Sequence, residues 1–105
     1  MQNGVSFSEE NRVLTAFLSG DIDHHSAKNM RESIDARLFA CKPEILVINF
    51  SGVKFMDSSG IALIIGRSEL AGSLGVALRL SGLSPLDKRL LRLSGVEKLK
   101  NISII

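Results

Sequence analysis

The segment from Glu44 to Arg67 constrains the fold of this 105-residue chain more than any other stretch. It begins with an apolar, largely β-branched run, Glu44–Phe50, which is typical of a central strand covered on both faces. A polar loop is expected to follow Phe50, and a helix is expected from Ser58 to about Ala71. A strand, a loop and a helix in this order predict a unit of an α/β fold.

The patterns on either side of this segment predict the remaining elements. In chain order they are a strand hairpin (5–8 and 13–19), a helix (24–40), the strand and helix above, a strand (76–80), a helix (84–95) and a strand (101–105). Asp23 or a neighbour is expected to cap the first helix, and Ser84 followed by Pro85 predicts the start of the last one. The order β-β-α-β-α-β-α-β predicts an α/β fold with a mixed, mostly parallel sheet, in one domain covering residues 1–105.

Composition indicates a cytoplasmic protein without a membrane partner. Apolar residues make up 45% and charged residues 23% of the chain, as in ordinary globular proteins. No apolar run approaches the roughly 18 residues that a membrane span needs, and residues 1–6 do not look like a signal peptide. The single cysteine, Cys41, cannot form an internal disulfide.

Charge is unevenly placed along the chain. From Arg79 to Lys100 there are six basic and two acidic residues, against seven basic and nine acidic residues elsewhere. This basic end is expected to be the solvated side of a helix, with contact to an acidic partner as the alternative. Because the chain has no Trp or Tyr, a stacking platform for single-stranded nucleic acid is not expected.

Catalytic and cofactor chemistry lacks the required residue patterns. The serine at 58 is not in a Gly-x-Ser-x-Gly elbow, and no group is evident to orient His24 or His25 as a base for it. The two histidines and Cys41 are too few and too scattered to bind a metal, and no phosphate-cradling glycine loop occurs. We therefore expect no enzyme activity, no metal and no cofactor.

Ser58 itself allows two interpretations. A serine at the first turn of a helix commonly serves as its N-cap, accepting a hydrogen bond from an unpaired amide. The same position also suits a phosphate, which would meet those amides and the positive end of the helix dipole. The segments 20–24 and 51–58, which hold many acidic and hydroxyl residues, are expected to be loops at the carboxyl ends of parallel strands, where such sheets place their sites.

Three separated segments resemble the bacterial anti-sigma factor antagonists, which share the STAS fold, named for sulphate transporters and anti-sigma antagonists. They are Phe55-Met-Asp-Ser-Ser-Gly-Ile61 with Leu63 to Arg67, Gly20-Asp-Ile-Asp-His-His-Ser-Ala27, and Ser84-Pro85 through Val96. The double histidine is typical of the sporulation (sigma-F pathway) member. The resemblance covers nearly the whole chain, with its spacings intact.

The resemblance implies a phosphorylation switch. In that family an anti-sigma factor that is also a serine kinase uses ATP to phosphorylate the first serine of Asp-Ser-Ser-Gly, here Ser58. The unmodified antagonist binds the anti-sigma factor and frees the sigma factor, and a PP2C-type phosphatase resets the modified form. The implied docking surface comprises Gly20, Asp21, Asp23, His24, Asp57, Ser59, Gly60 and Ile61.

A phosphate on Ser58 would add about −1.5 to −2 charges. We expect it to bond the amides of Ser59, Gly60 and Ile61, with Gly60 leaving the backbone open near the serine. It would then block docking through its charge and that of Asp57, without refolding the chain.

Two alternatives remain open from the sequence. One is a STAS module that serves as a scaffold in a larger signalling assembly and is never phosphorylated, and the other is an enzyme using Ser58 and a histidine. Family members commonly carry a further helix after the last strand, whereas this sequence ends at Ile105. We expect a monomer.

Overall fold

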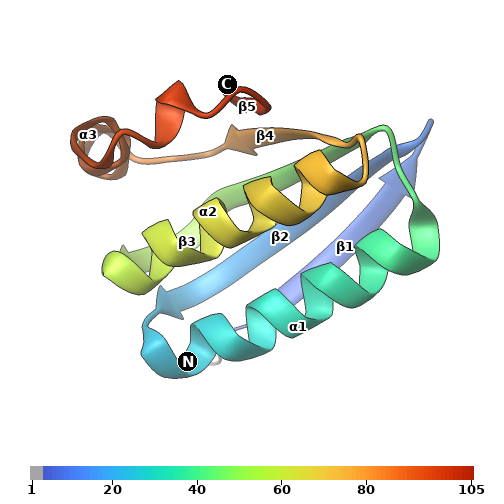
Figure 1. The fold of residues 1–105 in the computed structure, drawn as a ribbon. Helices are drawn as coiled ribbons and strands as arrows, with labels where there is room; N and C mark the ends of the chain where they lie inside the picture. Colours follow the sequence, from blue (N-terminus) through green and yellow to red (C-terminus); the bar gives the residue numbers. More distant parts are fainter. Residues whose placement is uncertain (1–3) are drawn as a thin grey trace.

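The computed structural model describes residues 4–105, which form a five-stranded sheet with helices packed against it (Figure 1). Residues 1–3 lie outside the described residues. They belong to the segment 1–6, which does not look like a signal peptide in the sequence. The elements are β1 (Gly4–Glu10), β2 (Val13–Ile22), α1 (His24–Cys41), β3 (Ile45–Met56), α2 (Ser58–Ser73), β4 (Ala77–Ser81), α3 (Pro85–Ser94), a 3-10 turn (Val96–Lys98) and β5 (Ile102–Ile104). The predicted order of strands and helices is confirmed. None of the helices in residues 4–105 combines the length and apolar content needed to cross a bilayer.

The sheet is mixed and mostly parallel, as predicted. Its strands lie in the order β1-β2-β3-β4-β5, with β1 antiparallel to β2 and every other neighbouring pair parallel. Asn11 and Arg12 form the hairpin turn, with φ values of 51° and 65°. Positive φ at both central residues is the geometry that lets a two-residue turn follow the twist of its strands.

Only one face of the sheet is fully buried. Leu46, Ile48 and Phe50 of β3 are buried, whereas their neighbours Ile45 and Val47 are half-buried. Figure 1 shows α1 and α2 on the same side of the sheet. Helix α1 connects β2 to its parallel neighbour β3, and α2 connects β3 to its parallel neighbour β4, so the chain moves across the sheet in the same direction both times. Right-handed crossovers that follow one another in this way place their helices on one side of the sheet. The prediction that this strand is covered on both faces is therefore wrong.

The strand β3 is longer than predicted. The apolar run ends at Phe50, but the strand continues to Met56 and pairs with β2, Ser19 opposite Gly52 and Ile22 opposite Met56. Most of the added residues are exposed, so the segment has strand hydrogen bonding without an apolar pattern. The prediction of a loop directly after Phe50 is wrong, because the ten-residue β2 supplies a partner for the whole extension.

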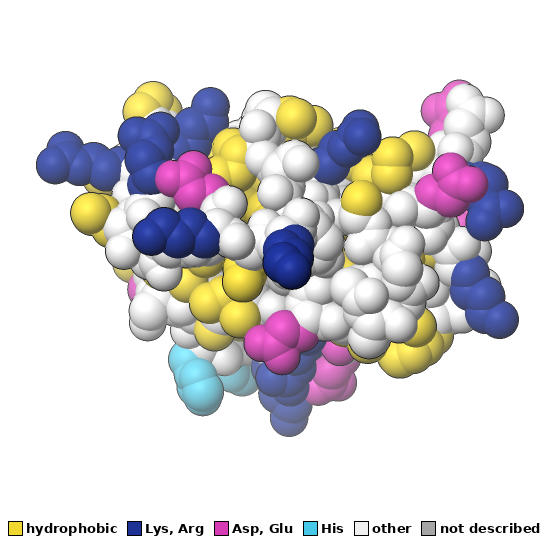
Figure 2. All heavy atoms as spheres, turned by 45° about the horizontal axis from the view of Figure 1, so that its top comes forward, with side chains coloured by type: hydrophobic (Ala, Val, Ile, Leu, Met, Phe, Trp, Pro, Cys, Tyr) yellow, Lys and Arg dark blue, Asp and Glu magenta, His cyan; other side chains and the backbone are white. Residues whose placement is uncertain are grey.

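The last helix, α3, turns much of its leucine face to solvent. Leu91 is fully buried, whereas Leu86 and Leu93 are 75% and 79% exposed. Figure 2 shows Lys and Arg side chains gathered at the end of the molecule over this helix, which carries Lys88, Arg89 and Arg92. This agrees with the interpretation of the basic end as a solvated helix face.

Candidate functional site

The two segments predicted to dock a partner meet where the adjacent strands β2 and β3 reach their carboxyl ends, which form one edge of the sheet. Asp21 lies opposite Phe55 in the ladder between β2 and β3, and the amide of Asp57 donates to the carbonyl of Ile22 at 3.1 Å. The carboxyl ends of parallel strands share an edge, so α1 and α2 both begin here. Residues 20–22 and 51–56 are paired strands, so the prediction of two loops is wrong although their adjacency is as expected.

The predicted docking residues differ in exposure. Exposed members are Asp21 and His24, half-buried ones are Asp23, Asp57, Ser59 and Ile61, and Gly20 and Gly60 are buried. Their role in binding a partner stays a prediction.

A reciprocal pair of hydrogen bonds fixes the start of α1. Asp23 Oδ1 accepts from the amides of His25 at 3.0 Å and Ser26 at 2.8 Å, while Ser26 Oγ accepts from the Asp23 amide at 3.1 Å. The Ser26 hydroxyl also donates to the carbonyl of Asp21 at 2.7 Å. The Ser26 amide is the main cause of a pKa for Asp23 below its usual value. Asp23 is the cap, as expected, and the buried Ser26 completes a capping box that the sequence interpretation missed.

Asp57, and not Ser58, caps α2. Asp57 has extended backbone angles (φ −98°, ψ −165°), and its Oδ1 accepts from the Ser59 amide at 2.7 Å. The Asp57 carbonyl accepts from the Gly60 amide at 3.0 Å. The interpretation of Ser58 as the N-cap is therefore wrong, because the preceding aspartate already takes that position.

Ser58 is the first residue of α2 and is exposed. Its hydroxyl makes no hydrogen bond to any residue in the range 4–105, so it is available to an approaching enzyme. Two of the amides expected to receive a phosphate, those of Ser59 and Gly60, are already bonded to Asp57. Both amides are therefore already satisfied in the unmodified protein, and a phosphate on Ser58 would add its charge beside the Asp57 carboxylate at the positive end of the helix.

Gly60 allows the first turn of α2 to pack on the end of β3. A Cβ atom at this position would overlap Cγ and Sδ of Met56. Gly60 is buried against that side chain, so close packing, and not the expected open backbone near Ser58, explains the glycine. Ile61 is half-buried against the core and Ile64 is fully buried.

Phe55 adds an apolar group to this edge that the sequence interpretation missed. Its side chain is 57% exposed on the extension of β3, opposite Asp21 and three residues before Ser58. Exposed aromatic residues are enriched where proteins bind one another. This exposure was not predicted, because residues 51–58 were expected to form a loop, in which no strand alternation indicates the face that a side chain takes.

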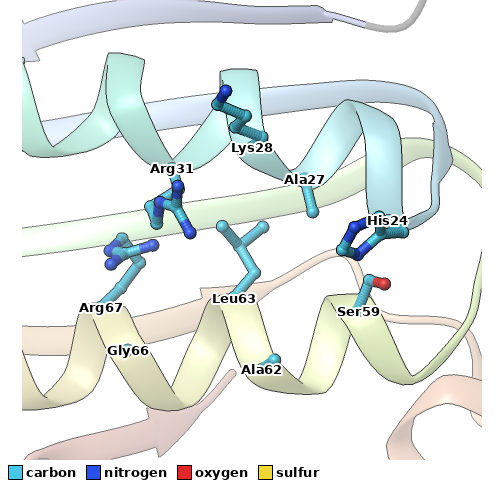
Figure 3. A pocket seen from close by; sticks show the side chains of 9 residues that line it. All are labelled: His24, Ala27, Lys28, Arg31, Ser59, Ala62, Leu63, Gly66 and Arg67. Atoms are coloured by element: carbon cyan, nitrogen blue, oxygen red, sulfur yellow. The ribbon is translucent and has the colours of Figure 1, made fainter.

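His24 and Ser59 lie side by side at one end of a groove between α1 and α2 (Figure 3). Among the described residues no hydrogen bond joins His24 to Ser59 or to Ser58, and none orients its ring. This geometry gives no support to the alternative of a serine and histidine acting in catalysis.

Comparison with known proteins identifies the family of this chain. Residues 5–103 match the STAS domain. The anti-sigma F factor antagonist of Paenibacillus polymyxa is 32% identical over 98 residues, which cover 93% of this chain and 84% of the relative. The structure of the anti-sigma factor antagonist SpoIIAA in its unphosphorylated form superposes with a TM-score of 0.72 at 25% identity, covering 86% of this chain and 83% of the other. An anti-sigma factor antagonist from Mycobacterium paratuberculosis has a TM-score of 0.83 at 25% identity, covering 96% and 85%. The chain therefore belongs to the STAS domain family.

Proposed function

We propose that this chain is an anti-sigma factor antagonist whose unphosphorylated form binds an anti-sigma factor with serine kinase activity and releases the sigma factor. The three similar proteins reported above are antagonists of anti-sigma factors by name, which supports this role. Phosphorylation of Ser58 by the bound partner, with ATP as donor, switches the binding off, and a PP2C-type phosphatase restores it. The chain works in the cytoplasm by binding alone and catalyses no reaction itself.

The observation that carries this proposal is the position of the Ser58 hydroxyl. It is exposed on the first turn of α2 and unbonded among the described residues, while Asp57 holds the cap. Modification therefore leaves the hydrogen bonds that start the helix in place. The exposed Phe55 beside it gives a partner an apolar surface at the same edge.

The charge of a phosphate supplies the switch. Ser58 would gain about −1.5 to −2 charges next to Asp57, at an edge that also holds Asp21 and Asp23. A like charge placed in a packed interface costs several kcal/mol. For a phosphate on the first residue of α2 we take a binding cost of about 2–3 kcal/mol, which corresponds to a loss of roughly 30- to 150-fold in affinity.

The site of modification is tested by incubating the protein with its candidate anti-sigma factor and ATP and locating phosphate by mass spectrometry. The variant Ser58→Ala should stay unlabelled. The variant Ser73→Ala is the matched control, since Ser73 is an exposed serine at the other end of the same helix, and it should be labelled like the parent protein. Label on another residue, or none from a kinase shown to be active on a known antagonist, would contradict the proposal and favour an unphosphorylated scaffold.

The electrostatic account is tested by measuring the affinity for the anti-sigma factor by calorimetry. Ser58→Asp should bind at least about tenfold more weakly than Ser58→Asn, because the two side chains have nearly the same size and differ in charge. Equal binding by both variants would mean that bulk, and not charge, decides the switch.

A further inference from the structure

The groove between α1 and α2 contains an arginine pair that the proposed switch does not use. The groove has a volume of about 530 Å³ and runs from His24 and Ser59 along both helices. Arg31 of α1 and Arg67 of α2 point toward one another across it, and Lys28 stands at its rim with the ammonium turned away from α2 (Figure 3). Basic groups therefore line both walls of the groove.

Arg67 is buried without full hydrogen bonding. It is only 6% exposed, and its Nε lies 2.7 Å from Asp35 Oδ1 as an ion pair without hydrogen-bond geometry. Its Nη1 is buried and has no hydrogen-bond partner among residues 4–105. Burial and the nearby charge of Arg31 lower the pKa of Arg67, against the opposing effect of Asp35. A buried cationic donor of this kind is unfavourable unless an acceptor joins it.

The charges in the groove are not balanced by the protein. Asp35 is the carboxylate paired with Arg67, and within the described part of the chain neither Arg31 nor Lys28 has an ion pair within 4 Å. Two positive charges are thus left unmatched around one open space. A phosphate dianion carries about the same charge, and guanidinium groups bind phosphate oxygens in a two-pronged geometry.

We propose that this groove is a binding site for a small molecule bearing a phosphate monoester, with the phosphate held between Arg31 and Arg67. Lys28 adds a further positive charge at the rim. Apart from His24 and Ser59 at one end, the remaining lining is small or apolar, and it accepts the rest of the molecule. It consists of Ala27, Ala62, Leu63 and Gly66. The volume falls within the range of small-molecule sites and exceeds the need of a bare ion.

The site is tested on the unmodified full chain without any partner, so the result is independent of Ser58 phosphorylation. Inorganic phosphate and glycerol 3-phosphate are titrated at constant ionic strength while NMR follows the backbone amides and the Arg67 Nε–Hε signal. We expect saturable shifts at Arg67 and Arg31 with millimolar affinity, and tighter binding of the ester. Arg31→Gln should weaken binding at least about fivefold, and because Arg31 is exposed this variant should fold normally.

The matched control is Arg37→Gln, which removes a charge from the same helix at a side chain stacked 4.7 Å from the ring centre of Phe7, outside the groove. It should bind both probes like the parent protein. Equal weakening by both variants, non-saturating shifts, or shifts confined to the basic residues of α3 would overturn the proposal. Binding of a polyglutamate peptide in the groove without binding of either phosphate probe would also overturn it, in favour of an acidic protein segment.

Discussion

Two glycines of α2 should respond in opposite ways to the same substitution. Gly60 lies in the first turn, where an added Cβ would overlap the side chain of Met56, and Met56 is only 6% exposed. Gly66 lies two turns later, where an added Cβ meets nothing within 4 Å. We expect Gly60→Ala to destabilise the protein and Gly66→Ala to stabilise it.

The magnitudes follow from two opposing effects. Alanine is favoured over glycine inside a helix by about 0.8–1 kcal/mol, and this gain applies at both positions. At Gly60 the overlap reaches the middle of the Met56 side chain, so that side chain must change rotamer within a packed region. Overpacking of this kind costs about 1–3 kcal/mol, which leaves Gly60→Ala less stable by up to roughly 2 kcal/mol. One kcal/mol corresponds to about 4–8 °C in Tm for a domain of this size.

The assay is thermal and urea unfolding followed by far-ultraviolet circular dichroism, since the chain has no Trp or Tyr for fluorescence. Gly60→Ala should lower Tm by up to about 16 °C, and Gly66→Ala should raise it by about 3–8 °C. If both variants shift Tm in the same direction, the packing argument for Gly60 is refuted. A double variant Gly60→Ala, Met56→Ala that is no more stable than Met56→Ala would locate the clash elsewhere.

Three further predictions concern polar contacts. Ser84→Ala removes the hydroxyl that accepts from the Asp87 amide at 3.1 Å, and should lower the free energy of unfolding by about 1 kcal/mol in urea denaturation. Asp35→Ala leaves the buried Arg67 unpaired and should lower the free energy of unfolding in urea by about 2 kcal/mol, which is less than for a wholly buried pair because Asp35 is partly exposed. The double variant Asp35→Ala, Arg67→Leu should recover most of this loss. Because the pKa of Asp23 is lowered in the folded protein, its contribution to stability is complete above the ordinary value of 3.8 and is lost as the pH falls through the lower folded value. In Asp23→Asn the free energy of unfolding should therefore fall less steeply with decreasing pH below about pH 5.

The order of elements was predictable because each one carries a local signal. In α1 the residues Met30, Ile34 and Leu38 recur at helical spacing, and all three are buried in the structure. The extension of β3 was not predictable in this way. Residues 51–56 form a strand because β2 is long enough to pair with them, and a pairing partner distant in the sequence leaves no trace in local periodicity.

The candidate site was predictable in position but not in detail. Parallel strands place their carboxyl ends together, so the meeting of Asp21 and Asp57 at one edge followed from the order of elements. The cap was harder to assign, since Asp57, Ser58 and Ser59 are all good capping residues and only backbone angles select among them. The groove with its buried Arg67 depends on how two helices pack, which no single-helix pattern reports.

The starts of α1 and α2 have the same construction, and this bears on how a switch at this edge works. In each case a paired strand passes through a single aspartate, Asp23 or Asp57, directly into a helix, and the aspartate accepts hydrogen bonds from amides of the first turn. Neither junction has a loop whose conformation a phosphate could reorder. The hydroxyl of Ser58 takes no part in either cap, so modifying it breaks no hydrogen bond of the fold. A phosphorylation switch built on this edge therefore acts by changing the charge that a partner meets, on a surface whose shape is set beforehand by the two capped helices.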